Sequence, residues 1–326
     1  MIKVSKFLAM SAIVASALTM IVGCQSKSGP KKITIGFSQV GAESEWRTAN
    51  TVSIKQAATD FGINLQFSDA MNRQENQIKA IRSFIAQKVD VIAFSPTTTS
   101  GWETVLQEAQ RAKIPVILLD RGVDVKDESL YVTLMGSDFK VEGERAGNWL
   151  VEYMNSKGRG NETINVVELQ GTVGSDPAIQ RKAGFDEVIK KYPNYKVIRS
   201  QTGDFTRALG KEVMEAFLKA EGKNIHVLFA HNDDMAIGAI QAIEEYGLKP
   251  GQDIIIVSID GVKGAFEAMI AGKLNCTVEC SPLLGPQLMQ AAIDLKNGKT
   301  LPRRVLTEEG VFPAEVAAKE FPNRKY

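Results

Sequence analysis

The chain has 326 residues, 44% of them hydrophobic and 24% charged, a composition that excludes a disordered chain and a fibrous one. This length is sufficient for two lobes of ordinary domain size. The 39 Lys and Arg residues almost balance the 38 Asp and Glu residues. A nearly neutral chain argues against nucleic acid or an anionic membrane surface as a main partner.

The first 23 residues have the features of a secretory signal peptide. Lys3 and Lys6 form a positive start, and residues 8–22 form an apolar stretch too short to span a bilayer comfortably. The junction Ile21-Val22-Gly23-Cys24 resembles a bacterial lipobox, in which the cysteine is lipid-modified; the alternative is ordinary cleavage beside an incidental cysteine. We therefore expect lipid attachment at Cys24 and a flexible tether over residues 24–32, which contain Ser, Lys, Gly and Pro.

From residue 33 onward, short apolar runs alternate with amphipathic stretches of helical period. This alternation is typical of βαβ units and therefore predicts a parallel sheet. The pattern runs once through the first half of the chain and starts again near residue 164, which predicts two similar lobes. The expected strands are residues 33–38, 63–67, 89–94, 116–119 and 131–134 in the first half and 164–169, 196–199, 225–230 and 254–259 in the second.

The stretch Ile114–Gly122 is the clearest of these strands, because its apolar run ends directly in Asp120 and Arg121. In open α/β sheets, ligands bind beyond the carboxyl ends of the strands, so this acid and this guanidinium are expected to face a crevice. A surface ion pair is the alternative, but polar residues recur after other strands and favour a cleft between the lobes. These residues are Ser38, Gln39, Gln170, His231, Asn232 and Asp260.

The same loops contain acids and aromatic residues whose roles are less certain from sequence. Asp233 and Asp234 stand where a helix begins, so N-capping and the helix dipole explain them better than a ligand does. Trp46 and Phe205 are candidates for covering the apolar face of a ring, although packing alone explains a single aromatic residue. Carboxylates, guanidiniums, an amide and an aromatic face together suit a polyhydroxylated ligand such as a sugar.

Longer stretches of this chain are similar to the periplasmic sugar-binding proteins of bacterial ABC importers, and within them to the galactofuranose-binding branch. The similarity extends from about Ile33 to near the C-terminus. It is carried by residues 36–47 (GFSQVGAESEWR), 75–84 (ENQIKAIRSF), 118–121 (LLDR), 166–174 (VVELQGTVG), 178–181 (AIQR), 200–207 (SQTGDFTR), 230–235 (AHNDDM) and 258–261 (SIDG).

The resemblance implies a set of residues that contact the sugar from both lobes. The three arginines and three acids among them balance in charge, which suits a neutral sugar better than a sugar acid or phosphate. No metal and no cofactor is expected. The implied ligand-binding residues are Glu43, Trp46, Arg47, Asp120, Arg121, Arg181, Phe205, Asn232 and Asp260.

The resemblance also implies an α/β fold of two doubly wound, Rossmann-like parallel-sheet lobes joined by a three-crossing hinge, the type I periplasmic binding protein fold. The expected N-terminal lobe comprises residues 33–137 with 281–306, and the C-terminal lobe residues 138–280 with 307–326. The lobes would close over the sugar, and a membrane permease would recognise the closed form. We expect a monomer, anchored by lipid in the cell envelope, in the periplasm or on the outer face of the cytoplasmic membrane.

The same residues give weaker support to other classes of function. A glycosidase needs two opposed carboxylates, and Glu43, Asp120 and Asp260 have arginines or strand ends that explain them better. A sugar-responsive repressor needs a helix-turn-helix where this chain has its leader. A sensor subunit that signals to a receptor and a binder of ribose or another pentose stay open. Ribose is less favoured because Cys280 stands where ribose-type relatives have a sugar-binding glutamine.

The remaining cysteines and histidines do not suggest a disulfide or a metal. If residues 275–279 form a strand, Cys276 and Cys280 are about 13 Å apart, too far for a disulfide. His226 and His231 are the only histidines, and none of these residues has zinc-site spacing. We expect both cysteines to be buried apolar residues.

Overall fold

Strand β4 (Val116–Leu119) is covered on both of its faces. Val116 and Leu118 pack into one hydrophobic cluster, whereas Ile117 and Leu119 pack into another. Side chains of a strand alternate between the faces of its sheet, so a continuous apolar run requires an apolar layer on each side. The structure, a computed structural model that describes residues 32–326, provides these layers with helices. The expected signal peptide, Cys24 and most of the expected tether lie outside the described residues.

Two six-stranded sheets are formed, one from each half of the chain. Every strand pair of the first sheet is parallel, and in the second sheet the β10–β12 pair alone is antiparallel. The first sheet has the order β11 (Arg304–Leu306), β5 (Thr133–Gly136), β4, β3 (Val91–Phe94), β1 (Thr34–Gln39), β2 (Asn64–Asp69). The second has the order β12 (Val311–Pro313), β10 (Cys276–Glu279), β9 (Ile255–Asp260), β8 (Val227–Ala230), β6 (Ile164–Gln170), β7 (Tyr195–Thr202).

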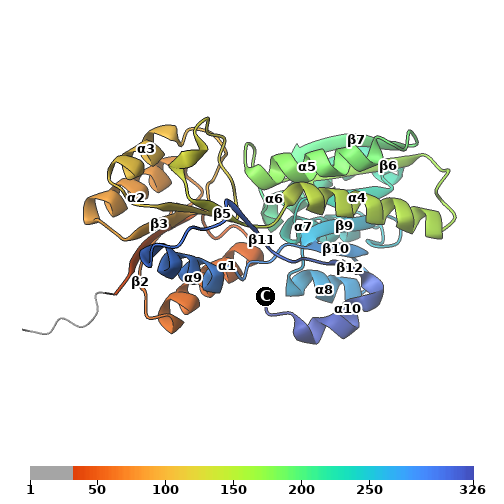
Figure 1. Cartoon of the computed structure of the whole chain (residues 1–326). Coiled ribbons are helices and arrows are strands. Elements are labelled where there is room, and N and C mark those ends of the chain that lie inside the picture. The colour runs from red at the N-terminus through yellow and green to blue at the C-terminus, as the bar shows by residue number, and fades with distance from the viewer. Residues whose placement is uncertain (1–31) are drawn as a thin grey trace, which may run out of the picture. The chain divides into compact units, whose positions relative to one another are not determined.

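Helices cover both faces of the first sheet (Figure 1). One hydrophobic cluster joins the sheet to α1 (Glu45–Asp60) and α9 (Gly285–Lys296). The cluster on the opposite face joins it to α2 (Gln74–Gln87) and α3 (Glu103–Arg111). Amphipathic helices on both sides of a parallel sheet are the expected result of right-handed βαβ crossovers.

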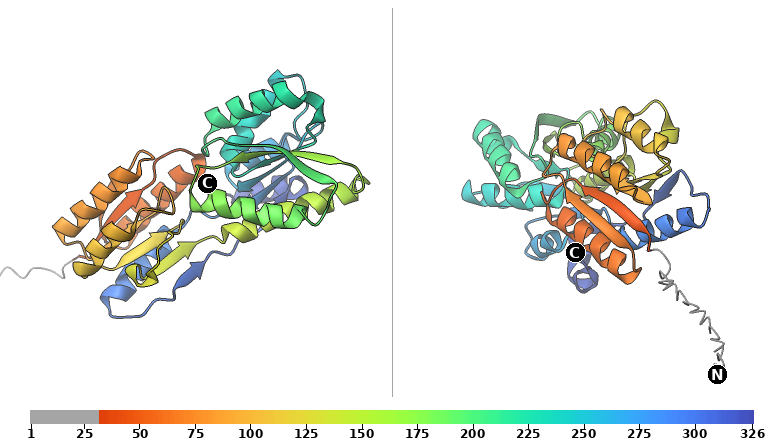
Figure 2. Two further views of the ribbon diagram at one scale, coloured as in Figure 1. Left: turned by 90° about the horizontal axis from the view of Figure 1, so that it is seen from above. Right: turned by 90° about the vertical axis from the view of Figure 1, so that its left-hand side faces the viewer.

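The second sheet is also enclosed by helices, and its core forms one continuous hydrophobic cluster. Figure 2 shows this sheet between the helix pair α4–α5 and the pair α6–α7. These helices are α4 (Phe139–Ser156), α5 (Asp176–Ile189), α6 (Arg207–Glu221) and α7 (Asp233–Glu245), with α8 (Lys263–Ile270) and α10 (Ala314–Glu320) near the end of the chain. Short 3₁₀ turns lie at Glu128–Leu130, Gly222–Asn224 and Phe321–Asn323.

The chain passes between the two sheets three times: between β5 and α4, between β10 and α9, and between β11 and β12. We propose the lobe limits expected from the sequence, because they fall within these three passages. The predicted α/β class with two parallel sheets is confirmed. The sequence did not predict β11 and β12, because a strand of three residues is too short to show alternation. No helix within residues 32–326 is long and apolar enough to cross a membrane.

Candidate functional site

All the residues predicted to bind a ligand line one cavity, although they come from distant parts of the chain. The strand-end rule had placed four of them at a cleft, namely Asp120, Arg121, Asn232 and Asp260, and the resemblance had implied the others. The empty space among their side chains is about 280 Å³ when the open solvent at the mouth is counted, so the cavity is small. Its lining consists of Glu43, Ser44, Trp46, Arg47, Asp120, Arg121, Phe139, Pro177, Arg181, Phe205, Asn232, Asp260 and Cys280.

Four lining residues were not predicted to bind: Ser44, Phe139, Pro177 and Cys280. Ser44 caps α1, since its hydroxyl accepts a hydrogen bond from the Arg47 N–H at 3.1 Å. Cys280 directly follows β10, so the strand-end rule would have found it if β10 had been recognised as a strand. Phe139 begins α4 just after a passage between the sheets, and no sequence signal marks it as a lining residue.

Arg47 is the centre of the charge network on the side of the first sheet. Its Nη2 lies 2.8 Å from Asp120 Oδ2 and its Nε lies 3.1 Å from Glu43 Oε1. Burial alone would lower the pKa of Arg47, but the two carboxylates outweigh burial and raise it. Arg47 therefore stays charged and pairs with both acids beside the cavity.

Arg121 is less well paired than Arg47. Its nearest carboxylate oxygens, on Glu43 and Asp120, are each 3.7 Å away. Burial, reinforced by the positive charge of Arg47, lowers its pKa to about 10. Its Nε has no hydrogen-bond partner among the described residues, and neither does Glu43 Oε2. One buried donor and one buried acceptor of the cavity lining are therefore unpaired, and leaving such groups without a partner is costly.

Arg181 organises the side of the second sheet. Its Nε donates to Glu142 Oε2 at 2.8 Å, its Nη1 donates to the His231 carbonyl at 2.5 Å, and its Nη2 lies 3.5 Å from Asp260 Oδ1. Burial raises the pKa of Glu142 to about 7 although Arg181 opposes this shift. Burial likewise raises the pKa of Asp260. Glu142 is fully buried and does not line the cavity, and the sequence analysis did not identify it.

Each cavity arginine lies over an aromatic ring. The guanidinium carbons of Arg47, Arg121 and Arg181 lie 4.6, 5.4 and 5.2 Å from the ring centroids of Trp46, Phe205 and Phe139 respectively. Flat guanidinium groups stack favourably on aromatic faces. The cavity lining therefore contains three pairs, each made of a planar cation and an aromatic ring.

Phe205 and Trp46 are held firmly. A Cβ at Gly171 would lie 1.8 Å from Phe205 Cζ, so only glycine leaves room for this ring. Trp46 Nε1 donates to the Cys280 carbonyl at 2.7 Å, so the tryptophan presents only its ring to the cavity. Asn232 Nδ2 donates to the Phe205 carbonyl at 3.2 Å, and Asn232 Oδ1 caps α7 by accepting from Met235 N at 3.0 Å.

The expectation that Asp233 and Asp234 cap a helix is wrong, because Asn232 is the N-cap residue of α7; both acids do lie in its first turn, as the helix-dipole interpretation expects. The Asp233 carboxylate accepts from the N–H groups of Gly261 and Val262 at 2.7 and 3.0 Å, and from two hydroxyls. It thereby fixes the loop after Asp260, whose φ of 133° is rare for a residue with a side chain. Burial raises the pKa of Asp233 to about 7.

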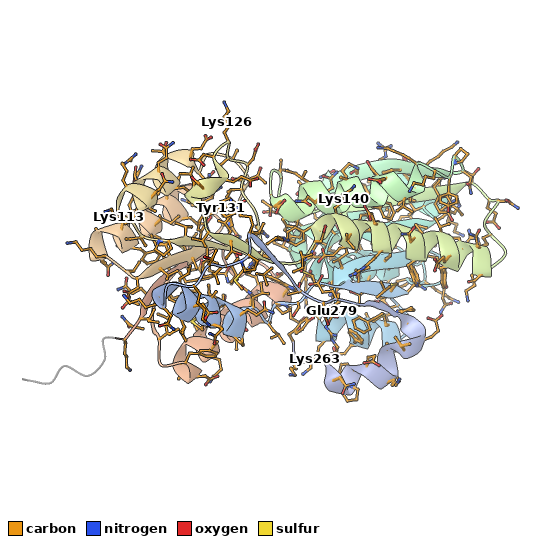
Figure 3. All side chains as sticks on the ribbon, in the orientation of Figure 1. Lys113, Lys126, Tyr131, Lys140, Lys263 and Glu279 are labelled. Atoms are coloured by element: carbon orange, nitrogen blue, oxygen red, sulfur yellow. The ribbon has the colours of Figure 1, made fainter. Side chains whose placement is uncertain are left out.

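The end of the chain supports the same loop from outside. Arg324 Nε donates to the Gly261 carbonyl at 3.1 Å, and Arg324 Nη1 lies 2.8 Å from Glu279 Oε1. Figure 3 shows Glu279 at the end of β10, beside the passages between the sheets. A C-terminal residue therefore links the Asp260 loop to the hinge.

Acidic and thiol groups gather where the chain passes between the sheets. Glu142, Cys280 and Glu309 present potential ligand atoms within 4.8 Å of one another. The Ser137 hydroxyl lies between two of them, 3.2 Å from Cys280 Sγ and hydrogen-bonded to Glu309 Oε1. The same Glu309 oxygen accepts from Ser281 N at 2.9 Å and Thr307 Oγ1 at 2.7 Å. Glu309 thus joins all three passages between the sheets, and hydrogen bonds among protein groups account for this cluster.

Cys276 and Cys280 are buried and unpaired, as expected from the sequence. Burial raises the pKa of both thiols well above the usual range, so both stay neutral. Cys276 belongs to the hydrophobic core, whereas Cys280 also lies 3.2 Å from the Ser137 hydroxyl and lines the cavity.

Comparison with known proteins gives consistent matches over most of the chain. The periplasmic binding protein domain family matches residues 35–300. The chain is 50% identical over 316 residues to the galactofuranose-binding protein YtfQ of Escherichia coli (strain K12), which covers 96% of this chain and 97% of that protein.

Two solved structures from other bacteria are similar as well. One, from Mycobacterium smegmatis in complex with β-D-fucofuranose, has 54% identity and a TM-score of 0.87, covering 90% of this chain and 95% of that one. The other is the periplasmic binding protein component of the arabinose ABC transporter from Shewanella sp. ANA-3, bound to α- and β-L-arabinofuranose. It has 51% identity and a TM-score of 0.85, with coverage of 90% and 95%.

Proposed function

Because this chain belongs to the periplasmic binding protein domain family, we propose that it captures a neutral monosaccharide in the cavity between its two sheets. The proposed ligand is a furanose, with galactofuranose as the first candidate. The protein then delivers the sugar to the membrane subunits of an ABC permease. It is a binding protein and catalyses no reaction.

The observation that carries this proposal is the pairing of polar groups in the cavity. Arg47, Arg121 and Arg181 are matched in number by the carboxyl groups of Glu43, Asp120 and Asp260, so the lining has no excess of basic or acidic groups that would favour an ionic ligand. Glu43 Oε2 remains as an acceptor and Arg121 Nε as a donor. A sugar hydroxyl both donates and accepts, so it satisfies these two groups without bringing a charge into a buried site.

A furanose is favoured over a pyranose by the similar proteins. Their names and bound ligands include galactofuranose, fucofuranose and arabinofuranose, which share a five-membered ring.

Each predicted residue has a distinct role in this proposal. Glu43, Asp120 and Asp260 accept hydrogen bonds from the sugar hydroxyls, and the arginines donate hydrogen bonds to them. Asn232 lies beside Phe205 on the side of the cavity that the second sheet provides. Trp46 and Phe205 cover the apolar faces of the ring, a use of aromatic surface that also shields the hydrogen bonds from water. The two lobes close over the bound sugar, because the lining comes from both.

The test is titration of the mature chain with sugars locked in one ring form. Methyl β-D-galactofuranoside and methyl β-D-galactopyranoside are isomers in which O4 or O5 closes the ring, so they differ in ring size and in the exocyclic chain that follows from it. Binding of each is read by tryptophan fluorescence and by calorimetry. We expect saturable binding of the furanoside and at least tenfold weaker binding of the pyranoside. Equal binding of both contradicts the furanose assignment. Absence of binding by either, and by arabinose and ribose, contradicts the sugar-binding proposal for this cavity.

Trp46→Phe is the control for the location of the signal. Trp102 and Trp149 are buried away from the cavity and report little of the ligand. The variant therefore loses most of the fluorescence change while calorimetry still detects binding. A fluorescence change that persists in this variant contradicts ligand contact at Trp46.

The proposed permease partner and the proposed lack of catalytic activity need separate tests. A strain lacking this protein is expected to lose uptake of the sugar; a loss of signalling with intact uptake instead supports the sensor alternative. Release of nitrophenol from 4-nitrophenyl β-D-galactofuranoside by the purified protein contradicts the assignment as a binding protein.

The proposal also includes a lipid anchor at Cys24. The Cys24→Ser variant is expected to lose its fatty acylation, seen by radiolabelled palmitate or mass spectrometry of the N-terminal peptide. An unmodified N-terminus in the unsubstituted protein contradicts the anchor.

A further inference from the structure

Contacts between the two lobes lie on both sides of the cavity mouth. On one side, Asp176 Oδ2 at the start of α5 accepts from the Gly122 N–H after β4, at 2.7 Å. Beside it, Thr99 N donates to the Gly174 carbonyl at 2.9 Å. These bonds join loops of the first sheet to the loop that leads into α5.

On the other side, one arginine bridges the lobes. Arg207, the first residue of α6, has its Nη2 2.8 Å from Glu45 Oε2 and its Nε 2.6 Å from Asp234 Oδ1. Asp234 Oδ2 also accepts from the Glu45 N–H at 2.8 Å. The start of α1 is therefore tied to the starts of both α6 and α7.

None of these groups lines the cavity, although their neighbours Ser44, Arg121 and Pro177 do. The contacts therefore need no ligand in order to form. The cavity lining comes from both lobes, so the lobes must separate, and these bonds must break, before a bound ligand can leave.

Resting on the proposed function, we propose that Asp176 and Arg207 are latch residues that set the lifetime of the closed, sugar-bound form without touching the sugar. Affinity of a closing protein depends on the balance between open and closed states as well as on ligand contacts. A bond made only in the closed state shifts this balance and slows ligand release.

The two latches differ in strength. Asp176 is buried, and its carboxylate accepts from a buried N–H, so this bond is charge-assisted and shielded from water. Arg207 has 48% of its side chain exposed and Glu45 has 35%, so water screens their ion pair. The Asp176 latch is therefore expected to dominate.

Stopped-flow measurement of sugar release tests the proposal. Asp176→Ala is expected to speed release about tenfold, the value of a charge-assisted bond, with little change in the association rate. Asp176→Asn keeps an acceptor for the Gly122 N–H and restores at least half of the loss on a logarithmic scale. Arg207→Gln is expected to speed release about threefold.

Matched controls stand on the same two helices. Asp186 on α5 pairs with Lys182 and Lys190, and Lys211 on α6 pairs with Glu215 and Glu245, so both bonds lie within one lobe. Asp186→Asn and Lys211→Gln remove the same charges as the latch variants and should change release less than twofold. Release rates of the latch variants that match these controls overturn the proposal.

A ligand-free readout separates this proposal from the proposed function. Spin labels at Lys126→Cys and Lys196→Cys, one exposed site on each lobe, report the distribution of lobe separations; native Cys276 and Cys280 are buried. Without sugar, Asp176→Ala should shift this distribution toward longer distances, and Asp186→Asn should not. An unchanged distribution overturns the latch even if sugar binds. Failure of every sugar to bind, with this shift present, overturns the sugar assignment and leaves the latch supported.

Discussion

Arg121 and Arg181 face the same cavity from opposite sheets, yet their surroundings differ. Arg121 has carboxylates no nearer than 3.7 Å and an unpaired Nε. Arg181 donates at 2.8 Å to Glu142 and at 2.5 Å to the His231 carbonyl. Burial lowers the pKa of Arg121, whereas for Arg181 the nearby acids outweigh burial and raise it.

This difference indicates a structural role for Arg181 and a ligand-binding role for Arg121. Arg181 has strong partners without a ligand, so it stabilises the second lobe whether or not the site is occupied. Arg121 has an N–H group without a protein acceptor, so a hydrogen bond from Arg121 is expected to contribute most to the binding free energy of a ligand. In the proposed function, the side of the first sheet, with free atoms on Arg121 and Glu43, is therefore the better first docking surface for a sugar, and the second lobe would close afterwards.

The largest effect is expected from Arg181→Gln. At pH 8, where Glu142 is ionised in the unsubstituted protein, this substitution leaves Glu142 and Asp260 buried without their cation, and breaking a buried pair in this way costs about 3–5 kcal/mol. Urea unfolding of the ligand-free protein should show this loss of stability. If Arg181→Gln unfolds at the same urea concentration as the unsubstituted protein, Arg181 is not a structural residue and the comparison fails.

Arg121→Gln is expected to weaken binding rather than stability. Arg47 still pairs with Glu43 and Asp120 after the substitution, so no acid is left without a cation. Loss of a buried charged donor to a ligand costs about 2–3 kcal/mol, which is roughly a hundredfold in Kd. Calorimetry should show this loss with an unchanged urea midpoint. A drop in midpoint with unchanged Kd would reverse the roles of the two arginines.

Glu142, the buried partner of Arg181, is expected to make the free energy of unfolding depend on pH. Burial raises its pKa from 4.5 to about 7, so the folded state holds a proton that the unfolded state releases. The stabilisation is fully present below pH 4.5 and is lost as the pH rises through 7, by on the order of 3 kcal/mol at most.

The Glu142→Gln variant should therefore lose less stability than the unsubstituted protein between pH 5 and pH 8, measured by urea unfolding at each pH. Asp233 is the necessary comparison, because burial also raises its pKa to about 7. Part of the decline should persist in Glu142→Gln for that reason. Parallel curves for the two proteins would contradict the shifted Glu142 pKa.

Much of the fold was predictable, because its signals are local. Runs such as Val116–Leu119 are apolar at every position, as a strand buried on two faces requires. The short strands β11 and β12 were missed because their sequence separation from their partners leaves no local signal. Their positions depend on pairing with β5 and β10, far away in the chain.

The cavity lining was predictable where a strand ends in a polar residue, as at Asp120 and Asp260. Roles that depend on pairing across the fold were not. Asp233 follows the rules of a helix start, yet its carboxylate holds the Gly261–Val262 loop, and only the tertiary structure brings these together. Glu142 was missed for the same reason: it looks like any acid on a helix until Arg181 is placed against it.

The smallest effect is expected from Arg82→Gln on the surface of the first lobe. Arg82 lies 2.9 Å from Glu108, closer than Arg121 lies to either of its acids, but 52% of its side chain is exposed. Water and salt screen this pair and its long side chains lose entropy when they meet, so the urea midpoint and the sugar Kd should both stay unchanged. Together with Arg121→Gln and Arg181→Gln, this variant separates distance from burial as the cause of an ion pair's effect. A midpoint shift for Arg82→Gln as large as that for Arg181→Gln would show that close approach alone is sufficient, and the assigned difference between the two cavity arginines would then need another cause.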